Sequence, residues 1–393
     1  MLDFGRRLMQ EAASVLGIDA STAARLIEPD RVVEVALPDP REGGGIIRAF
    51  RSQHSSALGP SKGGVRMSDA VTRAEVEALS LFMTLKNSTV DLPLGGGKGG
   101  VVVDPKTLDD NQRAEVGAAF ARNMAEVLGP DRDVVGPDVG TGQNEMDAIH
   151  HAWQEVRGAE GSPATGKSVE AGGLEYRTGA TARGLDIVFA TLIDHLERDS
   201  SLRFSVHGFG SVGRAIARHL TDRGHVLVAA SDSGGAAIDA DGLDLDELIE
   251  RKESEGSVSP DGGHGASVLT VDCDLIVPAA LQGVIDEATA REVKASIVLE
   301  GANGPTTWSG NRVLNERGVT VIPDILANAG GVSASFEEMT PPNERDETEV
   351  IDARFIERME TASEQVWAEA SDRSIDLRTA AAVCALERLI RAR

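Results

Sequence analysis

A glycine motif, Gly208, Gly210 and Gly213, most constrains what this chain can fold into. It follows the apolar run 204–206 directly, and apolar side chains then recur at the spacing of one helix face. In such a strand–turn–helix unit the first glycine permits the tight turn, the second lets the backbone approach a pyrophosphate, and the third lets helix pack on strand. The helix N-terminus attracts the anion. The spacing therefore predicts a dinucleotide-binding βαβ unit.

An acidic residue at the right distance strengthens this interpretation over a merely tight strand-to-helix packing. Asp232 ends the next apolar strand, 19 residues past Gly213, close to the ~20 expected of a carboxylate that binds a ribose hydroxyl. A carboxylate there repels a 2′-phosphate, so NAD is slightly favoured over NADP. The predicted cofactor contacts of this unit are Gly208, Phe209, Gly210, Ser211, Val212, Gly213 and Asp232.

Strands and helices alternate after residue 178, which predicts an α/β fold with a doubly wound parallel sheet. The apolar β-rich runs are 204–206, 226–228, 275–277, 297–299 and 319–322. A Gly- and Ser-rich stretch, 157–178, is the expected crossing between domains. We expect an N-terminal α/β substrate domain over 1–176 and a Rossmann-type domain over 177–350, with two helices in 351–393 packing back on the first domain.

The N-terminal region should contain helices over 72–86, 112–128 and 145–156, and a helix with a short strand between residues 11 and 37. The first of these helices opens with a capping box at Thr72 and Glu75. Glycine-rich turns are expected on either side of it, between residues 59 and 100.

Lysine is scarce, and its placement is selective. The chain has seven lysines among 39 basic residues, and Lys62, Lys86 and Lys98 fall within 37 residues. Lys is a compact charge whose pKa falls when it is desolvated, unlike Arg. Glycines flank Lys62 and Lys98, which leaves room for a small ligand. Lys86 lies on the apolar face of its helix, where it needs an anion. Solvated lysines are the alternative interpretation, and we accept it for Lys106 and Lys252.

Asp138 lies in a turn bounded by proline and glycines, before the helix at 145. It either faces a ligand or hydrogen-bonds its own turn and caps the helix.

Residues 161–168 match the phosphate-loop pattern G-x-x-x-x-G-K-S letter for letter. A phosphate loop needs a buried strand before it and a helix after it, whereas here a helical segment precedes and a glycine-rich stretch follows. We therefore expect a coincidental match, with a nucleotide hydrolase as a remote alternative.

Composition narrows the function further. With 63 acidic against 39 basic residues the net charge is −24, which repels nucleic acid and anionic membranes. An acidic, Lys-poor chain with 3% aromatic residues fits a halophilic cytoplasm, where salt screens self-repulsion. No apolar run is long enough to span a membrane, and two cysteines suit a reducing compartment. His150 and His151 are adjacent and diverge on a helix, so we predict no metal site.

Together these motifs resemble the glutamate dehydrogenase family, in the same order along nearly the whole chain. The segments that carry the resemblance are 59–100, the Pro137–Gly140 turn, the glycine motif, 300–305 and 324–331.

The resemblance implies a homohexamer that binds NAD or NADP and converts glutamate to 2-oxoglutarate and ammonium. It implies that Lys98 activates water, that Asp138 shuttles protons and that Lys86 holds the α-carboxylate. Lys62 and Ser335 would grip the side-chain carboxylate. By the same resemblance Met83 belongs to the substrate site, and Thr181, Asn303 and Asn328 belong to the cofactor site.

The residue types agree with these implied roles. Oxidative deamination of a dicarboxylic amino acid needs cations that bind its two carboxylates, a base of lowered pKa and a carboxylate that carries protons. We expect the neighbouring ammonium of Lys86 and desolvation to lower the pKa of Lys98. Two alternatives remain: a catalytically weak regulatory paralogue that assembles with an active enzyme, and a dehydrogenase for an apolar amino acid.

Overall fold

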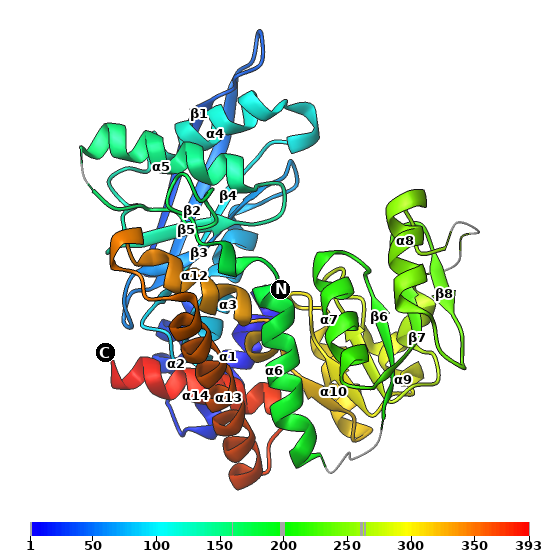
Figure 1. Ribbon diagram of the computed structural model, residues 1–393. Coiled ribbons are helices and arrows are strands. Elements are labelled where there is room, and N and C mark those ends of the chain that lie inside the picture. The colour runs from blue at the N-terminus through cyan, green and yellow to red at the C-terminus, as the bar shows by residue number, and fades with distance from the viewer. Residues whose placement is uncertain (1, 159, 197–200, 260–261, 263–264, 393) are drawn as a thin grey trace. The chain divides into compact units, whose positions relative to one another are not determined.

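The computed structural model describes residues 2–158, 160–196, 201–259, 262 and 265–392. They divide into two compact units (Figure 1). Unit 1 comprises Met1–Thr178, Val332–Arg354 and Ala382–Arg393; unit 2 comprises Gly179–Gly331 and Phe355–Ala381.

The C-terminal part divides differently from the expected domains. Residues 332–350 belong to unit 1 rather than to the dinucleotide-binding part, and 355–381 belong to unit 2. Two long helices, α13 (Thr348–Arg373) and α14 (Leu377–Arg391), each contribute residues to both units. Helical periodicity shows that a face is buried but not which core it faces, so the sequence could not make this division.

Unit 1 is built on a sheet of order β1-β2-β4-β3-β5 in the described ranges. Strands β1 and β2 and strands β2 and β4 pair antiparallel, whereas β3 pairs parallel with β4 and β5. Helices α4 and α5 pack on it through a core that includes Phe120, Ile149 and Trp153. The elements are α1 (Leu2–Val15), α2 (Ala20–Ile27), β1 (Arg31–Pro38), β2 (Ile46–Ser55), β3 (Ser61–Met67), α3 (Arg73–Thr89), β4 (Gly95–Val101), η1 (Pro105–Thr107), α4 (Asp110–Asn123), β5 (Asp133–Pro137), α5 (Gln143–Arg157), η2 (Glu175–Arg177), α12 (Gly330–Met339) and η4 (Pro342–Glu344).

The glycine-rich segments around α3 are strands, not the turns that the sequence predicted. Glycine has a low strand propensity, but here the missing side chains allow close packing. A Cβ on Gly96 would lie 2.2 Å from Thr84 Oγ1 of α3, and one on Gly64 would lie 2.8 Å from Asp138 Cβ. The glycines therefore let α3 and the Asp138 turn approach β3 and β4. Thr72 caps α3 by accepting a bond from Glu75 N, which is one half of the predicted capping box. The Glu75 carboxylate pairs with Arg66 instead.

Unit 2 has the predicted α/β architecture, with strand order β11-β10-β9-β6-β7-β8 among its described residues. The five predicted strands pair in parallel, and the short β8 adds an antiparallel edge. The first strand, β6, lies between β7 and β9, which is the point of reversal where doubly wound sheets bind ligands. The elements are α6 (Ala180–His195), β6 (Arg203–His207), α7 (Ser211–Asp222), β7 (Val226–Ser231), β8 (Ala236–Ile238), α8 (Leu245–Glu255), η3 (Gly265–Leu269), β9 (Leu275–Pro278), α9 (Glu287–Glu292), β10 (Ile297–Leu299), α10 (Trp308–Glu316), β11 (Thr320–Ile322) and α11 (Asp324–Ala327).

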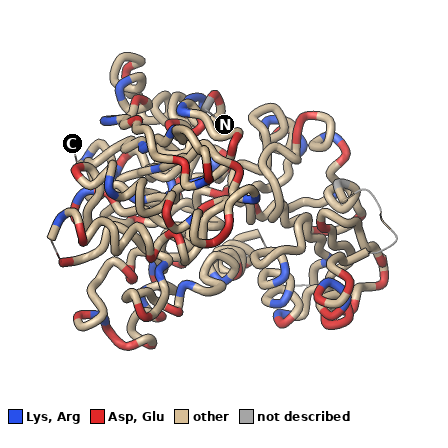
Figure 2. Tube along the Cα trace, turned by 90° about the horizontal axis from the view of Figure 1, so that it is seen from above, with Lys and Arg blue, Asp and Glu red and all other residues tan. Residues whose placement is uncertain are grey.

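Charged residues of both signs recur along the trace of each unit, with Asp and Glu the more frequent (Figure 2). Of the helices in the described ranges, none is long and apolar enough to cross a bilayer.

Candidate functional site

Lys98 and Asp138 form a buried ion pair in unit 1. Lys98 Nζ, on β4, lies 2.9 Å from Asp138 Oδ2, and the two side chains are 6% and 14% exposed. Arg66 Nε lies 3.0 Å from the same oxygen. The Asp138 carboxylate therefore does not cap α5, whose N-cap residue is Gly142. The Asp138 carboxylate faces these two cations, and its contact with a ligand stays a prediction.

The pKa values of Lys98 and Asp138 are both shifted. Burial lowers the pKa of Lys98, and the Asp138 carboxylate opposes that shift. Arg66 and Arg51 are the main cations that lower it further, in place of the Lys86 that we expected. For Asp138 burial raises the pKa, but Lys98 and Arg66 hold it below its ordinary value. A lysine of lowered pKa beside an ionised carboxylate is suited to proton transfer.

Lys62 and Ser335 are brought together through Arg177. Lys62, on β3, is 3% exposed and donates to Val135 O over 3.3 Å. Burial and then the charge of Arg177 lower its pKa to about 7. Arg177 Nε donates to Ser335 Oγ over 2.9 Å. Lys62 and Ser335 are buried, and the half-buried Arg177 adds a second positive charge.

Lys86 and Met83 both lie on α3, one helical turn apart. Lys86 is 8% exposed, as its place on the apolar face predicted. Met83 is half-buried, with Cγ 3.0 Å from where a Cβ on Gly63 would lie. Lys86 is thus buried, and Met83 lies against Gly63 of β3.

The glycine motif of unit 2 has the predicted backbone geometry. Gly208 has a φ of +102°, and Gly213 packs so closely that a Cβ would lie 1.9 Å from Gly208 O. A Cβ on Gly210 would meet nothing within 4 Å, so space is open there. Ser211 begins α7, whose first N–H groups have no acceptor within the helix. These features fit a dinucleotide pyrophosphate.

Two predicted cofactor residues are occupied within the protein. The ring of Phe209 is fully buried, and the backbone N–H of Phe209 donates to Ser231 O. Phe209 therefore shapes the turn. Asp232 accepts bonds from Lys252 Nζ, Ser257 Oγ and the N–H groups of Gly234, Gly235 and Val258.

These donors outweigh the effect of burial and lower the pKa of Asp232 to about 2. Lys252, which we expected to be a plain surface lysine, neutralises this carboxylate over 2.7 Å. The sequence reason for favouring NAD, an unpaired carboxylate that repels a 2′-phosphate, is therefore weakened.

The other predicted cofactor residues lie at the ends of α6, β10 and α11. Asn328 Nδ2 donates to Asn303 Oδ1 over 3.2 Å and to the Gly301 and Ala302 carbonyls. Thr181 is in the first turn of α6, with Oγ1 2.7 Å from a Cβ built on Gly331.

A buried network that the sequence did not reveal fixes the loop after β10. Arg378 pairs with Glu300 over 2.6 Å and with Asp324 over 3.4 Å, and Asp324 accepts from Gly304 N.

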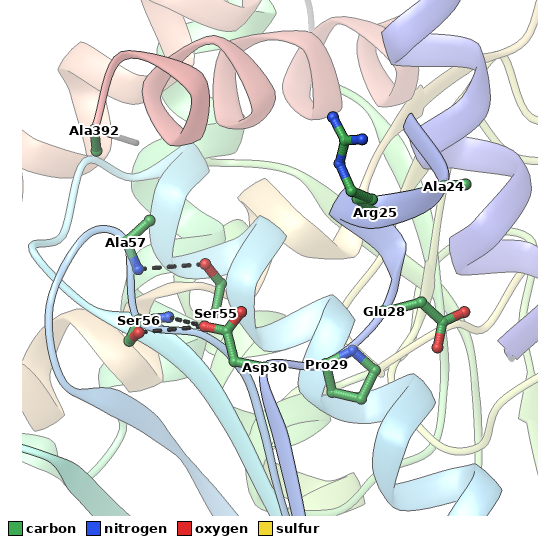
Figure 3. Close-up of a pocket in the computed structure, with 9 residues that line it drawn as sticks. All are labelled: Ala24, Arg25, Glu28, Pro29, Asp30, Ser55, Ser56, Ala57 and Ala392. Atoms are coloured by element: carbon green, nitrogen blue, oxygen red, sulfur yellow. Dashed lines mark hydrogen bonds between the residues drawn. The ribbon is translucent and has the colours of Figure 1, made fainter. Parts of the chain in front are cut away.

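Two surface pockets of unit 1 lie outside these residues. One, of about 640 Å³, is lined by Arg25, Asp30, Ser56 and neighbours, with Asp30 accepting bonds from Ser56 (Figure 3). The other, of about 460 Å³, is lined by residues 140–145 and parts of 105–113. Neither is lined by a predicted site residue. Within the described ranges no group of three or more His, Cys, Asp or Glu residues could hold a metal.

Residues 161–168 lack the surroundings of a phosphate loop. The helix α5 precedes them and turns follow, as predicted.

Comparison with known families identifies the chain. Residues 172–393 match Glutamate/Leucine/Phenylalanine/Valine dehydrogenase, and residues 29–155 match the Glu/Leu/Phe/Val dehydrogenase dimerisation domain. The chain belongs to this dehydrogenase family. Among its relatives is an NADP-specific glutamate dehydrogenase of Halobacterium salinarum, 40% identical over 97% of this chain and 94% of the relative. An NAD-specific glutamate dehydrogenase of Staphylococcus aureus is 35% identical over the same shares.

Solved structures of this dehydrogenase family have the same fold. A hetero-hexameric glutamate dehydrogenase from Thermus thermophilus superposes with a TM-score of 0.92 at 33% identity, covering 98% of this chain and 94% of that one. Glutamate dehydrogenase from Peptoniphilus asaccharolyticus gives 0.87 at 32% identity, covering 100% and 98%.

Sequence reasoning missed Arg177, Glu338 and Arg66. Arg is common in this chain, so no arginine stood out. Glu338 pairs with Lys167 and Arg177, about 170 and 160 positions away, and only the fold brings them together.

Proposed function

We propose that this chain catalyses the reversible NAD(P)-dependent oxidative deamination of L-glutamate to 2-oxoglutarate and ammonium. The observation that carries the proposal is the buried Lys98–Asp138 pair, in the same unit as the cationic Lys62, Arg177 and Ser335 group. The named relatives support the same reaction.

Two sets of hydrogen-bond donors would hold the two carboxylates of glutamate. Lys86 binds the α-carboxylate, with Met83 packing beside it. Lys62, Arg177 and Ser335 bind the side-chain carboxylate, which distinguishes glutamate from leucine, valine or phenylalanine. Because Lys62, Lys86 and Ser335 are buried and Arg177 is half-buried, their bonds to a carboxylate are stronger than in water.

Lys98 and Asp138 would carry the proton transfers. The lowered pKa of Lys98 makes a neutral amine accessible, which takes a proton from the water that attacks the iminium carbon. Asp138 then exchanges protons with Lys98 and with the amino group that leaves as ammonium. NAD or NADP, when bound, would supply the acceptor for the hydride that leaves the substrate Cα.

The glycine motif, Thr181, Asn303 and Asn328 would hold NAD or NADP, with unit 2 as the dinucleotide-binding part. Unit 1 would be the substrate part, in place of the expected division into 177–350 and 1–176 with 351–393. Gly210 and the first turn of α7 would hold the pyrophosphate. NAD stays slightly favoured over NADP, but the pairing of Lys252 with Asp232 weakens the reason for that preference. Assembly as a homohexamer in a salt-rich cytoplasm completes the proposal.

Steady-state assays with each cofactor, in molar salt, test this function. Glutamate should be oxidised and leucine, valine and phenylalanine should not. Lys62→Leu should lose glutamate and gain apolar amino acids, because it removes a cation from the side-chain clamp. Unchanged selectivity in Lys62→Leu would refute the clamp, and preference for an apolar amino acid in the wild type would refute glutamate as substrate.

A regulatory subunit is the second candidate. The Thermus relative is described as a hetero-hexamer, which shows that members of this family assemble from unlike chains. Activity of the isolated chain separates the two, since a regulatory subunit turns over slowly without its partner.

A further inference from the structure

The carboxylate of Glu338, on α12, is completely enclosed by donors. Gly166 N donates to both of its oxygens, over 3.0 and 2.9 Å, and Lys167 N lies 3.4 Å from Oε1. Lys167 Nζ is 3.1 Å from Oε1, and Arg177 Nη1 is 3.2 Å from Oε2. The Glu338 side chain is 0% exposed. One ammonium group, one guanidinium group and two successive backbone amides thus hold one carboxylate.

The turn that supplies these amides, residues 165–168, is an anion nest. Gly166 has a φ of +86°, which favours glycine, and a Cβ there would lie 2.8 Å from Arg177 Nη1. This turn ends the segment whose letters match a phosphate loop. It does bind an anion through its amides and its lysine, but that anion is the chain's own Glu338.

Arg177 connects this nest to the proposed substrate clamp. Its Nε donates to Ser335 and its Nη1 pairs with Glu338. Ser335 and Glu338 are one turn apart on α12, so the planar guanidinium bridges the two. Two separate contacts on one rigid helix fix the direction in which Arg177 presents its remaining donors.

We propose that Glu338 is a positioning residue for the substrate: by filling the 165–168 nest it holds Arg177 beside Ser335 and Lys62, where the side-chain carboxylate binds. This inference rests on the proposed function and deepens it. Glu338 itself touches no reacting atom. Its role is to supply a permanent anion that holds the Arg177 side chain in one orientation.

Glu338→Gln tests positioning through the separation of KM from kcat. The amide keeps the size but turns one acceptor oxygen into a donor facing Gly166 N or Arg177. We expect KM for glutamate and 2-oxoglutarate to rise about tenfold, as for loss of a bond to a charged group. We expect kcat and the cofactor KM to stay within about twofold, because Lys98 and Asp138 are untouched.

Glu337→Gln is the matched control. Glu337 is also buried on α12, but it pairs with Arg354, which is 42% exposed, over 2.7 Å. It should leave the substrate KM within about twofold. An unchanged KM in Glu338→Gln, or a fall confined to kcat, would overturn the positioning role. A lower KM would also overturn it, because Glu338 would then be competing with the substrate for Arg177.

Glu338→Ala with added acetate tests the nest without any assay of turnover. Acetate replaces the carboxylate that the substitution removes. We expect the variant to unfold at a lower temperature than the wild type. Acetate at constant ionic strength should raise that unfolding temperature again, whereas neutral acetamide should not. Glu337→Ala should show no such specific recovery. Absence of recovery in Glu338→Ala would refute the nest.

Failure of the proposed function would be recognisable separately. If the wild type oxidises no glutamate, that function fails, yet acetate recovery still decides the nest. Calorimetric binding of glutarate, a non-reacting dicarboxylate, to wild type and Glu338→Gln then decides the positioning role: about tenfold weaker binding supports it, and equal or tighter binding overturns it.

Discussion

Lys62 should take up a proton when a dicarboxylate binds. Burial and then the charge of Arg177 lower the pKa of Lys62 to about 7, with Arg51 acting in the same direction and Glu338 and Asp133 opposing it. Only the protonated amine pairs with a carboxylate. Binding therefore pulls a proton from solvent at any pH above this value, and affinity falls as pH rises through it.

The expected uptake follows from the fractions protonated. At pH 8, one unit above the free pKa, about one-tenth of the Lys62 side chains are charged. A bound carboxylate raises the pKa by ~2 units, which makes about nine-tenths charged. Binding at pH 8 should thus take up about 0.8 protons per site, and at pH 6 only about 0.1, because the free side chain is already charged there.

Calorimetry of glutarate binding in two buffers of different ionisation enthalpy measures this uptake. Lys62→Met is the control, since it keeps the apolar stem and removes the titrating group. Any proton that Lys98 exchanges remains in the control and subtracts out. Equal uptake in wild type and Lys62→Met, or uptake at pH 6 as large as at pH 8, would refute the reasoning.

Three further substitutions probe the other parts of the molecule. Asp138→Asn should fold, as circular dichroism would show, and lose about 10²–10⁴-fold in kcat because a proton carrier is gone; normal turnover would remove it from the mechanism. Lys252→Met should lower kcat/KM for NADP relative to NAD, since it leaves Asp232 unneutralised; an unchanged ratio would contradict that role. Arg378→Met should cost about 3–5 kcal/mol in urea unfolding because it leaves buried carboxylates unpaired. Adding Glu300→Gln should recover part of this loss, and no recovery would argue against a charge effect.

The dinucleotide-binding part was predictable from sequence because its signals are local. The glycines of the motif, the strand before them and the apolar helix face after them lie within about 20 residues, and each has one physical reason. The strand β8 escaped prediction because Ala236–Ile238 is too short to show a period. Asp232 was predicted from its spacing to the glycine motif, and spacing cannot show that its carboxylate forms an ion pair with Lys252.

The substrate part was predictable where composition or a local turn, as at Asp138, made a residue conspicuous. Lys62, Lys86 and Lys98 stood out because lysine is rare, and all three are buried. Arg177 is one of many arginines, so nothing distinguished it. The glycines around Lys98 predict turns, whereas the structure has strands there. Glycine disfavours strands unless close packing by another element requires it.

The buried ammonium groups of unit 1 differ in the partner that each has within the protein. Lys98 has Asp138 and Lys167 has Glu338, and each pair places a carboxylate within about 3 Å of the nitrogen. Lys62 donates instead to the neutral Val135 carbonyl. The carboxylates of Glu338 and Asp133 act on it, but burial and the cations Arg177 and Arg51 outweigh them and lower its pKa. Removing a cation from water is costly unless an anion compensates it. A substrate side-chain carboxylate would supply that compensation, whereas an apolar side chain would not. The cost of desolvating the Lys62 ammonium therefore favours a ligand that carries a second negative charge.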